Sequence, residues 1–253
     1  MSLVVFTSII GAWDNLRSPE VIEPGVRYVC YSDVPRDPVE GWEIQPAYTP
    51  FAHAGRNARL PKILPHLHFD AEYSIYLDAN FVLRGKPSDI LGRHLDVADI
   101  AMYQHPCRNH IGEEDSCLRD LHTKGELPGL EGQLLAAQVS LWKHHGAPLG
   151  LWAGGFIVRR HTPAIRELNE TWWQLFRDGC TRDQISFPLA RHICGVEVNT
   201  LKGNIYACDE LAFHWHAAWK HKGDNPKYAT RQAELDTKRR RLVELAQYPV
   251  VRA

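Results

Sequence analysis

The chain has 253 residues, 44% hydrophobic and 23% charged, which is enough for one large globular domain with a sizeable core. Its formal net charge of -1 at pH 7 argues against a general nucleic-acid-binding protein, because such proteins are usually clearly basic. No stretch approaches the roughly 18 consecutive apolar residues of a membrane span. The six cysteines form no CxxC pair, which argues against a common zinc site, and we predict reduced structural thiols.

The first ten residues, MSLVVFTSII, are apolar but lack a basic start and a small-residue cleavage site. They predict a first strand and not a signal peptide, and hence a cytoplasmic protein. Further strands are predicted from short apolar runs at 27–31, 73–77, 99–103, 151–159 and 196–201. Helices are predicted from the periodicity of 57–67, 90–95, 130–145, 163–177, 182–192 and 229–247.

Two proline residues, Pro61 and Pro65, are expected near the start and the end of the first of these helices. The polar segment 106–124, rich in His, Cys and Glu, is predicted as a loop with a helical piece. Strands that alternate with helices predict an α/β fold, with a mixed, mostly parallel sheet flanked by helices. We assign residues 1–228 to this domain and 229–253 to a charged C-terminal helix and tail.

An acid and an amide interrupt the apolar segment YSIYLDANFVL, residues 73–83. If the strand continues, Asp78 and Asn80 point to the same side, because side chains two positions apart share a face. Their oxygen atoms suit a hard cation such as Mg²⁺ or Mn²⁺. In open α/β sheets, ligands bind outside the carboxyl ends of the strands, where these residues are placed. The alternative is a plain turn, which Asp and Asn both favour.

Several sequence blocks resemble glycosyltransferases of the GT-A fold. RNARLPKILPHLHFDAEYSIYLDANFVL, residues 56–83, is similar to the stretch in which Arg-Leu and "P..LP" precede a strand that ends in an Asp-x-Asp signature. Three further blocks resemble the plant mucilage-type glycosyltransferase-like domain family and its bacterial relatives. They are HPCRNHIGEED at 105–115, IVRRHTPAIRELNETWW at 157–173 and RDQISF at 182–187. A more distant resemblance is to the retaining galactosyltransferase and glycogenin family. The resemblance implies a GT-A-like, Rossmann-like fold and a role in polysaccharide biosynthesis.

This resemblance implies transfer of a sugar from a nucleoside-diphosphate donor, a UDP-sugar first, to a glycan or glycolipid acceptor. It also implies a Mn²⁺ or Mg²⁺ cofactor bound by Asp78 and Asn80, although an amide is a weaker ligand than the usual acid. A third ligand would come from HWHAAWK, where His214 precedes Lys220 by six residues, as the ligand precedes a diphosphate-binding lysine in the galactosyltransferase group. His216 is the rival ligand.

Three cationic side chains of the first predicted helix would contact the diphosphate. Arg59 and Lys62 lie three positions apart on one helix face, and Arg56 is expected on the same face. The alternative is a solvated basic face without a role. By resemblance, base and ribose contacts come from three residues that border the first two strands, namely Thr7, Asp14 and Asp33.

The block TRDQISF places Asp183 and Gln184 at a helix start, where the helix dipole alone also accounts for an acid. In an inverting enzyme Asp183 would be the general base. In a retaining enzyme, which the resemblance to the retaining galactosyltransferase and glycogenin family favours, Asp183 or Gln184 would line the reacting face of the sugar. The residues implied on the acceptor or sugar side are Gly154, Gly155, His105, Arg108 and His161.

Two other functions fit parts of the sequence. A metal-dependent hydrolase would use the same acids and histidines to activate water, but HExxH is absent. A non-catalytic carbohydrate-binding module would use the many aromatic side chains for sugar stacking. The charged helix predicted at 229–247 packs on the domain, meets a partner or touches an acidic membrane surface.

Overall fold

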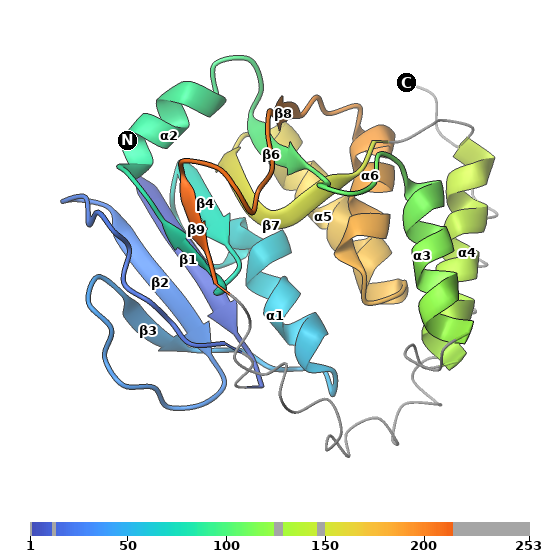
Figure 1. Cartoon of the computed structure of the whole chain (residues 1–253), viewed down its shortest axis with the longest axis horizontal. Helices are drawn as coiled ribbons and strands as arrows, with labels where there is room; N and C mark the ends of the chain where they lie inside the picture. The colour runs from blue at the N-terminus through green and yellow to red at the C-terminus, as the bar shows by residue number, and fades with distance from the viewer. Residues whose placement is uncertain (1, 12–13, 124–128, 146–149, 215–253) are drawn as a thin grey trace.

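The computed structural model describes residues 2–11, 14–123, 129–145 and 150–214. A seven-stranded sheet in the order β3-β2-β1-β4-β7-β6-β8 runs through its centre (Figure 1). All neighbouring strands of this sheet are parallel except β7, which is antiparallel to both β4 and β6. The strands are β1 (Leu3–Ile9), β2 (Arg27–Ser32), β3 (Glu43–Pro46), β4 (Tyr73–Leu77), β6 (Ile100–Gln104), β7 (Trp152–Arg160) and β8 (Asn199–Leu201).

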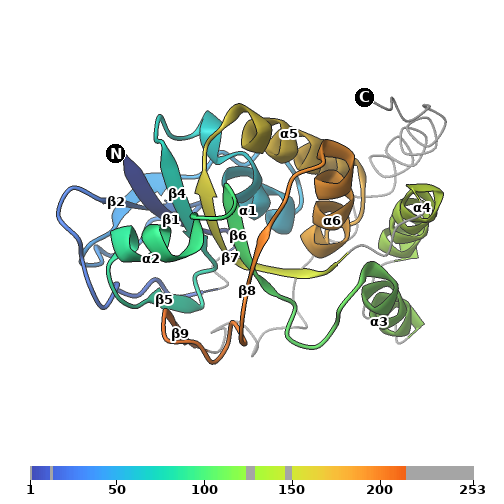
Figure 2. The same ribbon diagram turned by 90° about the horizontal axis from the view of Figure 1, so that it is seen from above.

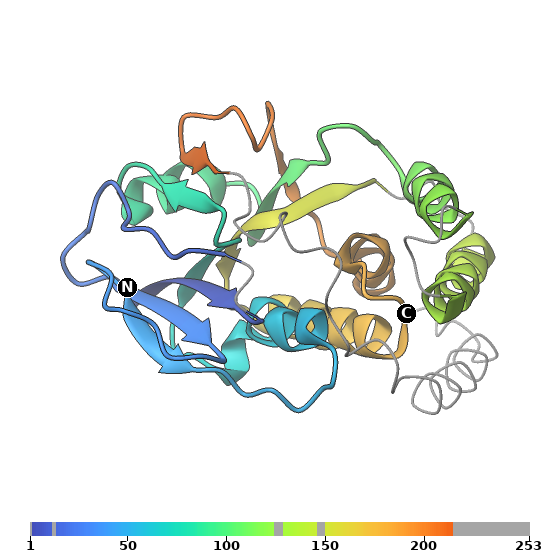
Figure 3. The same ribbon diagram turned by 60° about the horizontal axis from the view of Figure 1, so that its bottom comes forward.

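Helices cover both faces of this sheet, and a small two-stranded sheet of β5 (Phe81–Leu83) and β9 (Leu211–Phe213) lies beside it. The helices are α1 (Ala54–Ile63), α2 (Pro87–His94), α3 (Ile111–Thr123), α4 (Gly129–His145), α5 (Pro163–Asp178) and α6 (Asp183–Cys194). Figures 2 and 3 show α1 and α5 on one side of the sheet, and α2 with β5 and β9 on the other. One apolar core lies on each side. The prediction of an α/β fold with a mostly parallel sheet is confirmed.

The central strand β1 follows from its composition, because all seven residues of LVVFTSI are buried. A strand covered on both faces reads as a continuous apolar run, which is why the sequence shows it clearly. The six cysteines are free thiols in the structure. The predicted helix 229–247 lies outside the described residues.

Some predicted boundaries were wrong. Helix α1 begins at Ala54, so Pro61 lies inside the helix and not near its start. The cap position holds His53, whose side chain makes no capping hydrogen bond, so the sequence carries no start signal there. The helix ends before Pro65, as expected when the residue before a proline avoids helical geometry.

Candidate functional site

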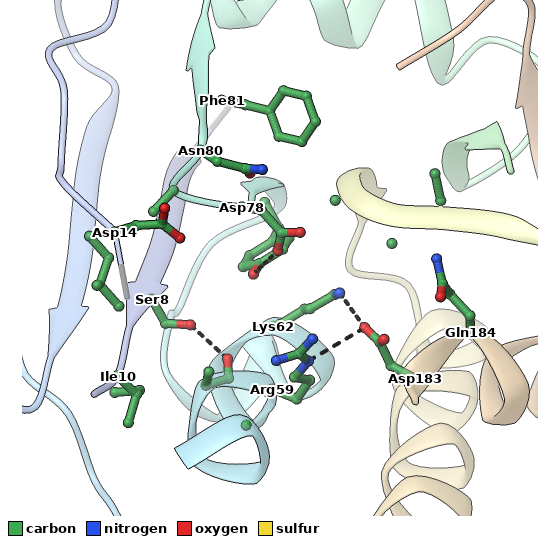
Figure 4. Close-up of a pocket in the computed structure, with 18 of the residues that line it drawn as sticks. Ser8, Ile10, Asp14, Arg59, Lys62, Asp78, Asn80, Phe81, Asp183 and Gln184 are labelled. Carbon is green, nitrogen blue, oxygen red and sulfur yellow. Dashed lines mark hydrogen bonds and ion pairs between the residues drawn. The ribbon is translucent and has the colours of Figure 1, made fainter. Parts of the chain in front are cut away.

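A cavity of about 470 Å³ opens where β1 and β4 reach their carboxyl ends. This volume is in the range of about 300–1,000 Å³ that is typical of small-molecule sites. The cavity wall is formed by the end of β1 and Asp14, by α1 and the residues just before it, and by the turn after β4 (Figure 4). Residues 105 and 106 after β6, the first part of β7, the start of α6, and residues 205 and 206 after β8 complete it. The cavity therefore lies where ligands bind in open α/β sheets.

The polar trio after β4 forms a turn beside this cavity. Strand β4 ends at Leu77, and the backbone N–H of Phe81 donates to the carbonyl of Asp78 at 2.9 Å. Asp78 and Asn80 therefore lie in a turn, the alternative that the sequence left open, and not on one face of a continuing strand. The turn nevertheless directs both side chains to the cavity wall (Figure 4).

The carboxylate of Asp78 is held in place from one side. Its Oδ1 atom accepts a hydrogen bond of 2.6 Å from the hydroxyl of Tyr76. The backbone N–H of Asp78 donates to the carbonyl of Gly155 at 2.9 Å, which joins the turn to β7. Oδ1 is thus engaged by the protein, and the carboxylate as a whole faces the cavity.

An ion pair between Lys62 of α1 and Asp183 of α6 lies in the wall of the cavity (Figure 4). Their side chains are only 3% and 6% exposed. The Nε atom of Arg59 lies 3.8 Å from the same carboxylate. Burial alone would raise the pKa of Asp183, but the positive charges of Lys62 and Arg59 outweigh it and hold the pKa well below its usual value. Asp183 is therefore a carboxylate at neutral pH.

The two glycines of β7 allow the charged groups to approach the strand closely. A Cβ atom on Gly154 would lie 2.8 Å from Nζ of Lys62 and 3.2 Å from Oδ2 of Asp183. A Cβ atom on Gly155 would lie 3.1 Å from Oδ2 of Asp78. A larger residue at either position would force the neighbouring charged side chains to shift, which accounts for glycine in a strand interior.

Three further predicted residues, Asp14, His105 and Gln184, also line the cavity. His105 accepts hydrogen bonds at Nδ1 from the backbone N–H groups of Cys107 and Arg108, at 3.2 and 3.1 Å. Burial, together with the charges of Arg108 and Arg182, lowers the pKa of His105 to about 4. The imidazole is therefore neutral at pH 7.

Arg56 does not reach the cavity, although it shares α1 with the two cavity cations. Its guanidinium is buried and donates to the carbonyls of Phe176, Arg177 and Gly179 at 2.7–2.9 Å. Each three-residue step on a helix leaves about 60° of rotation, so two steps carry Arg56 about 120° away from Lys62. The predicted donor contact of Arg56 is corrected to a structural link between α1 and the end of α5.

Two residues predicted near the base and ribose lie outside the cavity wall. Thr7 is buried within β1. Asp33 accepts hydrogen bonds from the backbone N–H of Gly11 at both carboxylate oxygens, at 3.0 and 2.9 Å. Its observed contact holds the loop that follows β1.

Two residues predicted on the acceptor side are also absent from the wall. Nε2 of His161 lies 2.7 Å from the hydroxyl of Ser74, beyond the end of β7 and far along that strand from the cavity glycines. Arg108 pairs with the buried carboxylate of Glu114 at 2.5 Å. It also approaches His105, at 2.9 Å, so it stands behind the wall.

The metal-site prediction is covered only in part by the structure. His216 and Lys220 lie outside the described residues. The backbone N–H of His214 donates to the carbonyl of Asn80 at 2.7 Å, so His214 lies next to the turn. Within the described part of the chain, no group of three or more His, Cys, Asp and Glu side chains is arranged to hold a metal ion.

The sequence analysis named no site role for several residues that line the cavity. They come from every part of its wall and include Ser8, His53, Gly55, Tyr76, Phe81, Arg182 and Tyr206. Most of them carry no pattern that separates a wall residue from an ordinary one. Only their position next to a strand end, as for Ser8 and Phe81, was a usable signal.

A family model for the TOD1/MUCI70 glycosyltransferase-like domain matches residues 39–210, which is more than half of the chain and includes most of the cavity wall. The chain belongs to this family. The resemblance found in the sequence blocks is thereby confirmed at the level of the family. Among the described helices, none combines the length and apolarity that a membrane span needs.

One similar protein is the "Probable hexosyltransferase MUCI70" of Arabidopsis thaliana, 23% identical over 242 residues. The alignment covers 83% of this chain and 41% of that protein, so the chain spans less than half of its relative. Among solved structures, the apo form of mouse xyloside xylosyltransferase 1 matches with a TM-score of 0.42 and 9% identity. That match covers 79% of this chain and 84% of the other.

Proposed function

We propose that this TOD1/MUCI70-type domain transfers a hexose from a nucleoside-diphosphate sugar, a UDP-sugar first, to a glycan or glycolipid acceptor. The observation that supports this most is the meeting of two cations, an acidic turn and a buried carboxylate in one cavity at the strand ends. The name of the Arabidopsis relative, a probable hexosyltransferase, agrees with the proposal.

In this proposal Arg59 and Lys62 bind the diphosphate of the donor. Both line the cavity from α1, and their charges suit a group that becomes more negative as the sugar leaves. The guanidinium of Arg59 offers a planar fork to phosphate oxygens. Asp14 lies near Ser8 and Ile10 at the end of β1 in the cavity wall, where they would contact the nucleoside (Figure 4).

Asp78 and Asn80 would hold a Mn²⁺ or Mg²⁺ ion together with the donor. Both line the cavity, and a carboxylate with an amide oxygen is a hard donor set that suits these ions. Two protein ligands leave positions for phosphate oxygens and water, with His214 next to the turn as a further candidate. When bound, such an ion would act as a Lewis acid on the diphosphate.

Asp183 and Gln184 would line the reacting face of the sugar. A carboxylate whose pKa is held well below its usual value has little affinity for a proton. Asp183 is therefore poorly suited to act as the general base of an inverting enzyme. This supports a retaining reaction, in which Asp183 holds Lys62 and orients the sugar.

Thermal unfolding in the presence of UDP-hexoses tests the proposal, with Mn²⁺, with Mg²⁺ and with a chelator. A donor at a hundred times its Kd would stabilise the protein by about 2.7 kcal/mol. We expect this gain in the wild type with metal, its loss in Asp78→Ala, and its retention in Asp37→Ala, where an exposed acid outside the cavity is removed.

Product analysis then separates the candidate reactions. We expect sugar to appear on an added acceptor and not only in water. Release of free sugar whether or not an acceptor is present would favour the metal-dependent hydrolase. Binding of free sugars without any binding of nucleotide sugars would favour the carbohydrate-binding module.

A further inference from the structure

An exposed aromatic ring stands in the cavity wall. Tyr206 is 50% exposed and lines the cavity. Several large apolar side chains are exposed in the described part of the chain, and Tyr206 is the one among them that lines the cavity. Aromatic side chains are among the residues that commonly line ligand cavities and contact the ligand there.

The ring of Tyr206 is fixed in its position before any ligand binds. It stacks on Phe81, with ring centroids 5.8 Å apart and planes at 23°. It also meets Phe213 edge-on, at 4.8 Å and 72°. The backbone N–H of Tyr206 donates to the side-chain oxygen of Asn204 at 2.9 Å, which fixes the loop. A rigid ring loses little conformational entropy on binding.

The ring lies in the part of the cavity away from the proposed nucleoside site. In the sheet, β1 lies on one side of β4 and β7, and β6 and β8 lie on the other. The end of β1 therefore belongs to one half of the cavity wall, where the nucleoside would bind, and the opposite half holds His105 after β6 and Tyr206 after β8. The charges of Asp78 and Arg182 act on the hydroxyl of Tyr206, so both side chains lie near this ring. Asp78 and Asp183 lie against the glycines of β7, between the halves, where the reacting sugar would be placed.

The opposite half suits a sugar better than a nucleotide. A pyranose ring presents an apolar face of C–H groups, which packs on an aromatic ring, and hydroxyls around its edge. The guanidinium of Arg182, which also lines this part of the wall, is a donor of hydrogen bonds that suits such hydroxyls.

We propose that Tyr206 is the stacking platform of an acceptor subsite that binds a pyranose ring of the glycan. The inference rests on the proposed transferase function and adds the position and the chemical class of the acceptor. It places the accepting sugar on the ring of Tyr206, with its hydroxyls toward Arg182 and the reacting hydroxyl toward the carboxylates between the two halves.

Saturation-transfer NMR with methyl glycosides of galactose, glucose, mannose and xylose tests this subsite in the presence of UDP and the diamagnetic ion Mg²⁺. The proteins compared are the wild type, Tyr206→Ala, Tyr206→Phe and Tyr48→Ala. The last removes a tyrosine that is 70% exposed and outside the cavity wall. UDP affinity is measured in parallel by thermal unfolding, and transfer of sugar to the best glycoside is measured with a UDP-hexose.

We expect saturation transfer to the C–H protons of at least one glycoside in the wild type. The ratio of glycoside affinity to UDP affinity should fall about tenfold in Tyr206→Ala, the size of effect expected for one aromatic contact. The ratio should stay near the wild-type value in Tyr206→Phe, which keeps the ring, and in Tyr48→Ala.

Three results would overturn the subsite while leaving the transferase assignment intact. The first is that Tyr206→Ala binds the glycosides as tightly as the wild type does. The second is that a wild-type protein that turns over UDP-hexose shows no saturation transfer to any glycoside. The third is that Tyr206→Ala loses as much affinity for UDP as it loses for the glycoside. The last result would assign the ring to the nucleoside. Failure of the transferase assignment itself looks different, because no nucleotide sugar then binds the wild type.

Discussion

Lys62 and Asp183 form an ion pair in the wall of the cavity although 121 positions separate them in the chain. The pair joins α1 to α6 directly beside Gly154 of β7 (Figure 4). Because both side chains are almost fully buried, each one neutralises a charge that is largely withdrawn from water.

Breaking this pair should destabilise the protein. Asp183→Asn leaves the ammonium of Lys62 buried without its counter-charge, for which we expect a loss of about 3–5 kcal/mol in the free energy of unfolding. The double variant with Lys62→Met should lose less than the sum of the two single variants. Urea unfolding measures all three, and strictly additive losses would show that the two side chains are not coupled.

The same pair should withstand mild acid. The pKa of Asp183 lies below its unfolded value of 3.8, so the stabilisation is present above that value and is lost only as the pH falls through the lower, folded pKa. The difference in unfolding free energy between the wild type and Asp183→Asn should therefore be the same at pH 5 and pH 7. A difference that has largely vanished at pH 5 would contradict the lowered pKa.

A methyl group on Gly154 should disable the site without unfolding the domain. It would lie 2.8 Å from Nζ of Lys62, so the ammonium has to move away from its place in the wall. We expect Gly154→Ala to lower turnover of nucleotide sugar at least about tenfold, since small misplacements of binding groups cost this much or more.

The matched control for this change is Gly92→Ala. Gly92 is exposed in α2, and a Cβ atom there meets nothing within 4 Å. It should keep wild-type turnover and gain up to about 1 kcal/mol of stability from its better helix propensity. Equal turnover in both variants would remove Lys62 from the mechanism.

The buried His161 should make the protein sensitive to acid. Burial, with the nearby charge of Arg159, lowers its pKa from 6.5 to about 3. Below pH 6.5 the unfolded chain binds a proton at this residue and the folded chain does not, so the free energy of unfolding decreases as the pH is lowered. At pH 5 this residue should lower it by about 2 kcal/mol. In His161→Gln the loss of stability between pH 7 and pH 5 should be smaller by about this amount. Parallel pH profiles for the two proteins would show that His161 does not titrate in this way.

Gly179 and Gln138 should be energetically coupled. A Cβ atom on Gly179 would lie 1.9 Å from Nε2 of Gln138. That amide donates to the carbonyl of Leu175 and accepts from the N–H of Cys180, both at 2.9 Å, and so joins α4 to the turn between α5 and α6. Gly179→Ala should cost about 1–3 kcal/mol. In a Gln138→Ala background its cost should shrink to about 0.5 kcal/mol, and an equal cost in both backgrounds would contradict this packing.

The sequence predicted the strands whose residues are buried on both faces. The run predicted at 3–10 is observed as Leu3–Ile9, and the strand predicted at 73–77 is observed as Tyr73–Leu77. An apolar run does not encode the direction in which it pairs, so the antiparallel pairing of β7 was not predictable. Strand β3 was missed because its four residues EIQP are partly or fully exposed and carry no apolar pattern.

Sequence patterns identified some residues of the site and missed others. Arg59, Lys62, Asp78 and Asp183 were each singled out from local patterns, and the fold brings all four to one cavity. Arg56 was misplaced because two three-residue steps along the helix rotate it about 120° away from Lys62, and so from the cavity into the core. Tyr206 was missed because a single aromatic residue in a polar segment has no periodicity to distinguish it.

The most direct test of this account is a crystal structure of the protein with UDP and Mn²⁺. We expect the diphosphate in the cavity between Arg59, Lys62 and Asp78, with the ion on the turn of Asp78 and Asn80. Density for UDP elsewhere on the protein, with this cavity empty in the same crystal, would contradict it.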